Sequence, residues 1–348
     1  MLAKIVLGGL TGIAFGYALQ RGRFCVNTAF RDVLFIKDST LLRALVLAIS
    51  VQLLGVTVLR SLHFFNQIQI PPFFWQANLV GGYVFGLGMV LAGGCASGSC
   101  YRTGEGMLGS LIALIAFGIT SLTTDSGALA PIERALRAQV LTAHGQPVTI
   151  DTLLGVNVWW VVAPIVVLAA WWVWRGRTVS HHSAGWSWRT AGFAIGLIGV
   201  AGWITSAATG REFGFSVTGP LRALFGYLAT GNTAYLDWGA WMLLGLILGA
   251  NLSAALHAER KLRLPKPNRL VQSLIGGVLM GFGAQIAGGC NIGHTFTGMA
   301  TLSIASLATT TAIFAGGWTM ILFMFIRPAW LERSLEAFKL GAARKVEA

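Results

Sequence analysis

The sequence contains several long apolar segments in which almost no residue is charged. Trp159–Trp174 and Trp238–Leu256 are two of them, and each is close to the length that a helix needs to cross a bilayer, about 20 residues. Charged residues make up only 11% of the chain, whereas a soluble globular protein carries roughly a quarter. Because hydrocarbon requires every backbone polar group to be paired within the chain, such segments fold as helices. The sequence therefore predicts an all-α integral membrane protein.

A glycine-rich motif occurs twice, and each copy contains two glycines followed by a cysteine. The first copy runs over Gly81–Gly98 and the second over Gly276–Gly293. All seven glycines of the first copy, together with Ala92 and Cys95, recur in the second at one offset, 195 residues, which both 276 − 81 and 290 − 95 give. Recurrence at so many positions indicates an internal duplication. Each half is then expected to contain one helix that breaks at its Gly-Gly-Cys sequence.

The distribution of basic residues predicts how the chain is oriented. Loops 31–43 and 260–269 and the C-terminal tail are rich in Lys and Arg, as cytoplasmic loops are. The mixed-charge stretch 125–151 is expected to be an external loop of short helices. The first glycine motif then enters the membrane from outside and the second from inside. This predicts two inverted-topology repeats whose re-entrant broken helices meet at the midplane of the bilayer.

This topology predicts about nine spanning helices plus re-entrant segments, with the N-terminus outside and the C-terminus in the cytoplasm. The predicted divisions are 1–175 for the first inverted repeat, 190–327 for the second and 328–348 for a cytoplasmic basic tail. The net charge of +13 does not indicate nucleic-acid binding. The basic residues lie in short clusters between apolar segments, which is the distribution of topology signals.

The chain has four cysteines, Cys25, Cys95, Cys100 and Cys290. They are too few and too scattered for a disulfide framework, and their spacing fits no zinc site, so neither a metal nor a cofactor is expected. Packing as a small apolar side chain is the favoured interpretation for a single cysteine. Cys95 and Cys290, however, follow Gly-Gly at equivalent points of two halves, which favours a functional role. Cys25 lies in a third break and has no twin, so both interpretations stay open for it.

The chemistry of the breaks favours an anion that contains sulfur. Gly94 and Gly289 are expected at a constriction, because glycine permits a left-handed helix cap and close approach of the backbone. Successive backbone N–H groups in 92–98 and 287–293 can form a concavity for an anion. A thiol is soft and polarisable and donates only weakly. Several weak donors in series suit conduction, because binding must be weak enough to let the ion leave.

Four arginines near the breaks are candidate anion attractors, Arg21, Arg23, Arg102 and Arg211. Arginine within a membrane is costly unless it pairs or faces water. The alternative, favoured for Arg23 and Arg211, is that the side chains bind backbone carbonyls and brace the broken helices. Glu105 is expected to neutralise Arg102.

Three more polar or thiol side chains lie close to the motif cysteines. His294 is considered for a role in the pathway beside a purely structural one. Asn291 is expected to act as a local helix cap. Cys100, five residues after Cys95, is a further candidate thiol.

Three stretches closely resemble the YeeE/YedE sulfur-transport family, namely Gln20–Asn27, Leu91–Gly98 and Ala287–His294. The resemblance extends from about Leu7 to Ile326 and implies a thiosulfate importer of the inner membrane, hourglass-shaped, with pseudo-twofold inverted halves. It further implies that Cys25, Cys95 and Cys290 pass thiosulfate along a central path through S–H···S contacts. A small cytoplasmic sulfur-carrier protein similar to TusA is the implied partner. Cys100 departs from the family's pattern, and some family members are linked to selenium metabolism.

Residues and resemblance together predict a transporter and not an enzyme, located in the bacterial inner membrane and passing thiosulfate along weak thiol and backbone N–H contacts. Two alternatives stay open. One is a membrane thiol enzyme in which a cysteine takes the outer sulfur of thiosulfate as a persulfide, which requires a thiolate of low pKa. The other is a transporter of a selenium species or another small sulfur anion.

Overall fold

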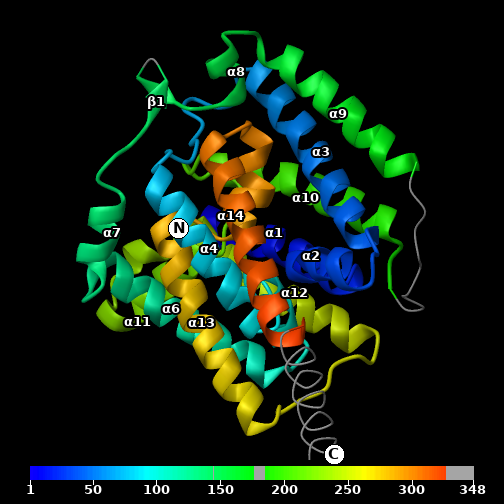
Figure 1. Ribbon diagram of the computed structural model, residues 1–348, viewed down its shortest axis with the longest axis vertical. Coiled ribbons are helices and arrows are strands. Elements are labelled where there is room, and N and C mark those ends of the chain that lie inside the picture. The colour runs from blue at the N-terminus through cyan, green and yellow to red at the C-terminus, as the bar shows by residue number, and fades with distance from the viewer. Residues whose placement is uncertain (144, 176–184, 327–348) are drawn as a thin grey trace, which may run out of the picture.

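The computed structural model describes residues 1–143, 145–175 and 185–326, and these residues are almost entirely helical (Figure 1). Within these ranges, nine helical stretches are long and apolar enough to cross a membrane. This confirms the predicted all-α membrane class and agrees with the expected number of spans. The predicted basic tail, 328–348, lies outside the described residues.

The first half begins with six helices. These helices are α1 (Leu2–Arg21), α2 (Val26–Phe35), α3 (Thr40–Ser61), α4 (Trp75–Leu91), α5 (Ala96–Gly104) and α6 (Leu108–Ser126). Breaks in the chain separate α1 from α2 and α4 from α5. The stretch 125–151 that follows contains the short helix α7 (Ala130–Leu136) and an antiparallel hairpin of β1 (Thr142–Ala143) and β2 (Gln146–Pro147). Short helices were expected here, and the hairpin was not. Helices α8 (Ile150–Leu154) and α9 (Val158–Arg175) complete this half.

The second half repeats this order of helices. It consists of α10 (Trp188–Ala207), α11 (Thr218–Thr230), the short turn η1 (Thr233–Tyr235), α12 (Trp238–Leu256), α13 (Pro267–Ala287), the π-helical η2 (Ile292–Gly298), the turn η3 (Met299–Thr301), α14 (Ile304–Ile321) and η4 (Leu322–Ile326). By order, α10 to α14 correspond to α1, α2, α3, α4 and α6, and η2 corresponds to α5.

Corresponding helices pack on corresponding partners. Helix α1 lies along α12 while α10 lies along α3, and α4 lies along α14 while α13 lies along α6. Two helices also contact their own counterparts in the other half, which are called twins below: α1 contacts α10, and α4 contacts α13. The twins α1 and α10 run antiparallel, since Thr11 bonds to Thr205 across 3.1 Å while Gly22 lies against Ala191. An exchange of the two halves therefore leaves the pattern of helix contacts unchanged.

The duplicated glycines lie where α4 and α13 touch. A Cβ atom on Gly88 would stand 2.7 Å from the carbonyl oxygen of Gly276, and one on Gly81 would stand 2.6 Å from that of Gly283. The N-terminal glycine of each motif thus faces the C-terminal part of the other, so these helices are also antiparallel. In a bilayer, helices associate through close van der Waals contact between small residues. The glycine motif is therefore a helix-contact surface as well as the approach to a break.

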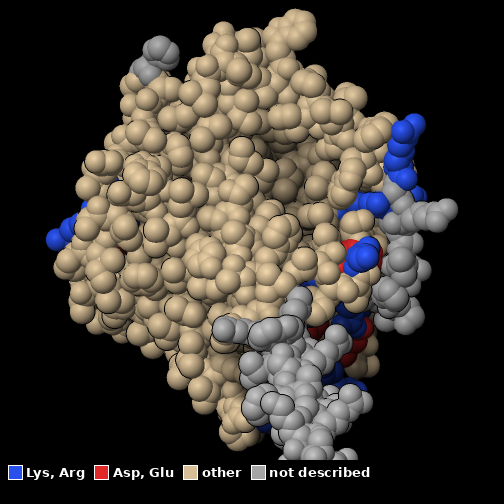
Figure 2. Space-filling model, in the orientation of Figure 1, with Lys and Arg blue, Asp and Glu red and all other residues tan. Residues whose placement is uncertain are grey.

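The outer surface suits a lipid environment. Figure 2 shows a broad face on which nearly all side chains are uncharged, with Lys and Arg at its margins. Large apolar side chains are exposed on the outer helices, for example Trp160 (78%) and Leu168 (64%) on α9 and Leu248 (62%) on α12. Such exposure would favour aggregation in water, whereas in a bilayer these side chains contact hydrocarbon.

Candidate functional site

The three motif cysteines stand at the starts of helices that follow breaks. Cys25 precedes α2 and Cys95 precedes α5, and each is the N-cap residue of its helix. Cys290 directly precedes Asn291, which is the N-cap residue of η2. All three are free thiols with at most 1% of their surface exposed. The position equivalent to Cys25 in the second half, the N-cap of α11, is Val217.

The two Gly-Gly-Cys breaks have the same backbone hydrogen bonds. In the first, the N–H of Gly94 donates to Met89 O (3.1 Å), and in the second that of Gly289 donates to Ala284 O (2.8 Å). Residues with positive φ precede these donors, Gly93 (+73°) and Gly288 (+85°). This is the Schellman type of helix end, which needs a left-handed residue. The left-handed conformation that was expected of Gly94 and Gly289 thus belongs to the glycine before each of them.

The second glycine of each pair makes room for a polar side chain. A Cβ atom on Gly94 would lie 3.1 Å from Nη1 of Arg102, and one on Gly289 would lie 3.1 Å from the ring of His294. Both distances are tighter than ordinary van der Waals contact. The absent side chains at Gly94 and Gly289 therefore let Arg102 and His294 close over the breaks.

Cys25 and Cys95 form a thiol pair. Their Sγ atoms are 3.5 Å apart, although the residues are far apart in the chain. The N–H of Gly98 donates to Cys95 Sγ across 3.3 Å, and Ser97 Oγ lies 3.6 Å from the same sulfur. A Cβ atom on Gly98 would stand 2.7 Å from Cys25 Sγ, so this glycine admits the second thiol. The pair lies at a helix N-terminus, where partial positive charge favours an anion.

The other two thiols have different surroundings. Cys290 makes no hydrogen bond through its sulfur within the described part of the chain, whereas Cys95 has three contacts. Cys100 lies inside α5 and is completely buried in the same apolar cluster as the other cysteines. It does not stand at a break. Cys100 therefore differs from the three cysteines of the motifs in lying within a helix and not at a break.

The candidate arginines bind protein groups. Arg102 donates to the carbonyl of Gly93, and Arg211 donates to those of Phe213 (2.8 Å) and Gly214 (2.9 Å). Both contacts brace a helix break. Arg23 bonds instead to Glu259 across 3.0 Å.

Glu105 is not the partner that was expected for Arg102. Its carboxylate accepts a hydrogen bond from Gln20 (3.1 Å), and no ion pair joins it to Arg102 among the residues with described positions. Arg102 is held instead by the backbone of the first break.

Sequence reasoning missed Arg137, which follows α7 and reaches the second break. Its Nε donates to Ile286 O (3.0 Å), its Nη2 donates to Gln285 O, and it pairs with Glu133 at 2.6 Å. The side chain thus caps the end of α13 from a different segment, as Arg102 caps the end of α4 from α5. Nothing in the sequence indicates that an arginine 149 positions from Ile286 lies against it.

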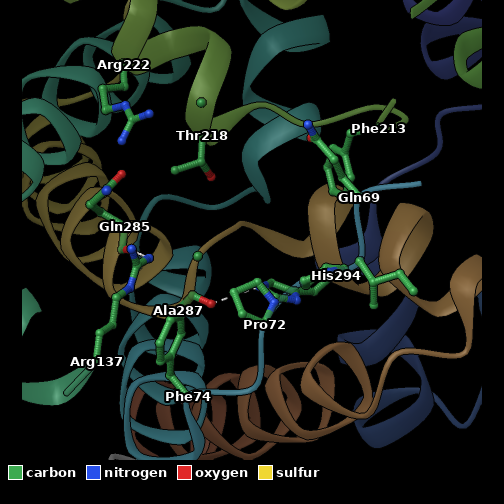
Figure 3. A pocket seen from close by; sticks show the side chains of 14 residues that line it. Gln69, Pro72, Phe74, Arg137, Phe213, Thr218, Arg222, Gln285, Ala287 and His294 are labelled. Atoms are coloured by element: carbon green, nitrogen blue, oxygen red, sulfur yellow. Dashed lines mark hydrogen bonds between the residues drawn. The ribbon is translucent and has the colours of Figure 1, made fainter. Parts of the chain in front are cut away.

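A cavity of about 330 Å³ borders the second break. Figure 3 shows Thr218 and Arg222 on α11 above it and Gln285, Ala287 and His294 from the second break below. Arg222 bonds to Asp125, and Arg137 bonds to Glu133, so the arginines of this cavity are paired. Among its described lining residues this cavity therefore has no free cation.

His294 is part of the wall of this cavity and is 1% exposed. Its Nε2 lies 3.0 Å from Ala287 O, and its Nδ1 lies 3.1 Å from Ser306 Oγ. A neutral ring with the proton on Nε2 satisfies both contacts, because the Ser306 hydroxyl then donates to Nδ1. Asn78 of α4 also donates to Ala287 O (2.9 Å). The carbonyl before the second Gly-Gly pair is thus fixed from two sides.

A second cavity, of about 170 Å³, borders the break that contains Cys25. Its charged lining residues are Arg23, Glu105, Glu259, Lys261 and Arg263. Burial raises the pKa of Glu105 above its ordinary value. Although partial desolvation opposes it, hydrogen bonds and ion pairs from Gln20, Arg23 and Arg21 hold the pKa of Glu259 below its ordinary value.

Comparison with known proteins identifies the chain. A sequence model of the family described as Sulphur transport matches residues 21–319. The chain belongs to that family. This confirms the resemblance drawn from the three cysteine motifs, and with the nine candidate spans among the described residues it makes the chain a multi-pass membrane protein.

Two known proteins are similar to this chain along nearly their whole length. The thiosulfate transporter TsuA of Spirochaeta thermophila is 39% identical over 332 residues, which cover 92% of this chain and 99% of the relative. The thiosulfate transporter TsuA of Escherichia coli is 34% identical over 345 residues, covering 94% and 97%. The probable transporter YedE of Escherichia coli shares 32% identity over 110 residues, 30% of this chain and 25% of its own length.

Proposed function

We propose that this protein imports thiosulfate, with Cys25, Cys95 and Cys290 as successive contact sites for the ion. The observation that carries the proposal is the buried pair of Cys25 and Cys95, with sulfur atoms 3.5 Å apart at the starts of two helices. The names of the two full-length relatives support thiosulfate as the substrate and transport, not catalysis, as the activity.

The ion's route follows the order of the cavities and breaks. The larger cavity adjoins the second break through Gly288 and His294, and the smaller one adjoins Cys25 through Arg23. The cysteines belong to one buried cluster, and the route joins the two cavities through it. By the distribution of basic loops, the larger cavity faces outward and the smaller one faces the cytoplasm.

The breaks give weak sites along this route. A dianion cannot enter hydrocarbon bare, and a free arginine at the constriction would hold it too long. Arg102 and Arg211 are instead engaged with carbonyls, which leaves thiols and helix N-termini to contact the ion. Small side-chain movements at these sites then suffice for passage.

The two halves act as inverted repeats in this proposal, divided at 1–175 and 190–327. The antiparallel contacts of α4 with α13 and of α1 with α10 support it, because twins related by inversion run in opposite directions. The protein lies in the bacterial inner membrane with its N-terminus outside. A TusA-like sulfur carrier on the cytoplasmic side would receive the imported sulfur.

Uptake of labelled thiosulfate by cells that lack other importers tests the proposal. Wild-type protein should support uptake, and Cys95→Ala or Cys290→Ala should reduce it at least about tenfold while membrane expression stays normal. Cys100→Ala is the matched control, because Cys100 is equally buried but lies within a helix, and it should retain uptake. Wild-type uptake in both Cys95→Ala and Cys290→Ala would refute the thiol path.

A further inference from the structure

Asn291 is a buried amide without a partner. The residue is 0% exposed, and neither its Nδ2 nor its Oδ1 makes a hydrogen bond within the described part of the chain. Asn78 and Asp151 each leave one buried oxygen unpaired while their other polar side-chain atom is bonded, whereas Asn291 leaves both of its polar side-chain atoms unpaired. Burying an amide without hydrogen bonds is unfavourable, so a side chain of this kind calls for an explanation.

The fold does not require an amide at this position. Asn291 was expected to cap the helix that follows, but its side chain makes no capping hydrogen bond. The equivalent residue of the first half, 195 positions earlier, is Ala96, which begins α5 after the same backbone turn. An apolar residue of similar size would avoid the cost of burial. The amide is therefore explained neither by local structure nor by symmetry.

The position of Asn291 points to a ligand. It directly follows Cys290, whose sulfur is also without a hydrogen bond in the described residues, and it precedes the π-helical turn η2. Turns of this kind are frequent at functional sites. At the other break, by contrast, Cys95 already receives the N–H of Gly98 and contacts Cys25. The Cys290 break thus combines a free thiol with a free amide donor.

We propose that Asn291 is a specificity-determining residue that binds the oxygen atoms of thiosulfate. The Nδ2–H group donates to an oxygen of the ion's SO₃ end, while the thiol of Cys290 contacts its terminal sulfur. This inference rests on the proposed function. The pair recognises both ends of the ion, whereas sulfate offers oxygen at every position and gains nothing from the thiol.

An amide suits this task better than a charged group. Asn291 supplies one donor dipole without net charge, and its Oδ1 offsets part of the attraction to an anion. Binding then stays weak enough for release, which conduction requires. A lysine or arginine here would hold the dianion, and an aspartate would repel it.

The test uses full-length protein in proteoliposomes, with labelled thiosulfate as the probe and unlabelled sulfate as the competitor. Asn291→Leu should raise the KM for thiosulfate by about tenfold or more, the effect of losing a hydrogen bond to a charged group. Sulfate should compete relatively worse against it than against wild type, because sulfate binds through oxygen alone, whereas thiosulfate keeps the contact of its terminal sulfur with Cys290. Asn291→Asp should abolish uptake. Asn291→Ala, which copies Ala96 of the first half, provides a second neutral variant if leucine prevents folding.

A stability measurement separates recognition from a structural role. Without thiosulfate, the melting temperature of Asn291→Leu should equal or exceed that of wild type, and thiosulfate should stabilise wild type more than the variant. Trp241→Phe is the control, because it removes another buried unpaired N–H on α12, and it should leave KM unchanged. A folded leucine or alanine variant with wild-type KM and wild-type sulfate competition would overturn this inference and leave the proposed function standing. Absence of uptake by wild type would overturn both.

Discussion

Each motif thiol differs from the others in what surrounds it. Cys95 is held by a backbone N–H and by two neighbouring side chains, Cys25 touches Cys95, and Cys290 stands beside an unpaired amide. A thiol becomes a nucleophile only when a base or a positive group favours the thiolate. No His, Lys or carboxylate hydrogen-bonds to Cys25, Cys95 or Cys290 in the described ranges. The described surroundings thus lack a hydrogen-bonded general base for covalent attack on the ion.

The first prediction concerns covalent chemistry. Wild-type protein that has been exposed to thiosulfate without reductant should show an unchanged intact mass, because a hydrogen-bonding path forms no bond to sulfur. Intact mass spectrometry measures this, with a thiol-alkylated sample as the control for accessible cysteines. One stoichiometric added sulfur on Cys25, Cys95 or Cys290, formed and lost at the rate of uptake, would establish the persulfide enzyme instead.

At the scale of elements, the contact between α4 and α13 determines how the two breaks are placed. The duplicated glycines bring the two backbones together, and each helix then ends in the same Schellman turn before its cysteine. Displacement of either helix would move the thiols of both halves. Helix association and the placement of the two breaks therefore depend on the same glycines.

The second prediction tests this contact. Gly88→Ala should lower the stability of the purified protein by about 1–3 kcal/mol, the usual cost of overpacking, because the new Cβ would lie 2.7 Å from backbone atoms of α13. Gly317→Ala on α14 is the matched control, since its Cβ would make only ordinary van der Waals contacts, 3.6 Å from the end of the Met89 side chain and 3.9 Å from Gly86 O and from Val90 Cγ2. The control should be neutral or slightly more stable, because alanine favours helix over glycine. Thermal unfolding in detergent measures both, and equal melting temperatures would contradict a tight α4–α13 contact.

Sequence patterns predicted those features that depend on local composition. Apolar length predicted the spans, and the repeated Gly-Gly-Cys predicted two helix ends of the same kind. The repeat did not reveal that Gly93 and Gly288, not the glycines after them, adopt the left-handed conformation, because either glycine of a pair can do so.

Contacts between distant segments could not be predicted. Arg137 at the end of α13, the pairing of Cys25 with Cys95, and the Gln20 bond of Glu105 all depend on how helices pack. A helical period specifies which face of a helix is apolar, but not which loop side chain reaches its end. The unpaired amide of Asn291 was missed for the same reason, since only the structure shows that no capping bond forms.

At the scale of the whole molecule, the main helix contacts of one half correspond to those of the other half. The pairs α1–α12 and α10–α3, and α4–α14 and α13–α6, follow from one another when the halves are exchanged. Because the twins α4 and α13 are antiparallel, such an exchange reverses direction along the helix axes.

The last prediction fixes the orientation of the whole molecule in the membrane. Basic loops favour the cytoplasm, so the loop 260–269 should face inward and the β1–β2 hairpin outward. Gln146 and Asn268 are both exposed, and a cysteine at either position offers a reactive thiol, while the four native cysteines are buried. An impermeant maleimide should label Gln146→Cys in intact cells and Asn268→Cys only after permeabilisation. Wild-type protein, which should stay unlabelled in both conditions, is the control. Labelling of Asn268→Cys in intact cells would reverse the assignment of the two cavities, so that the larger one would be the exit.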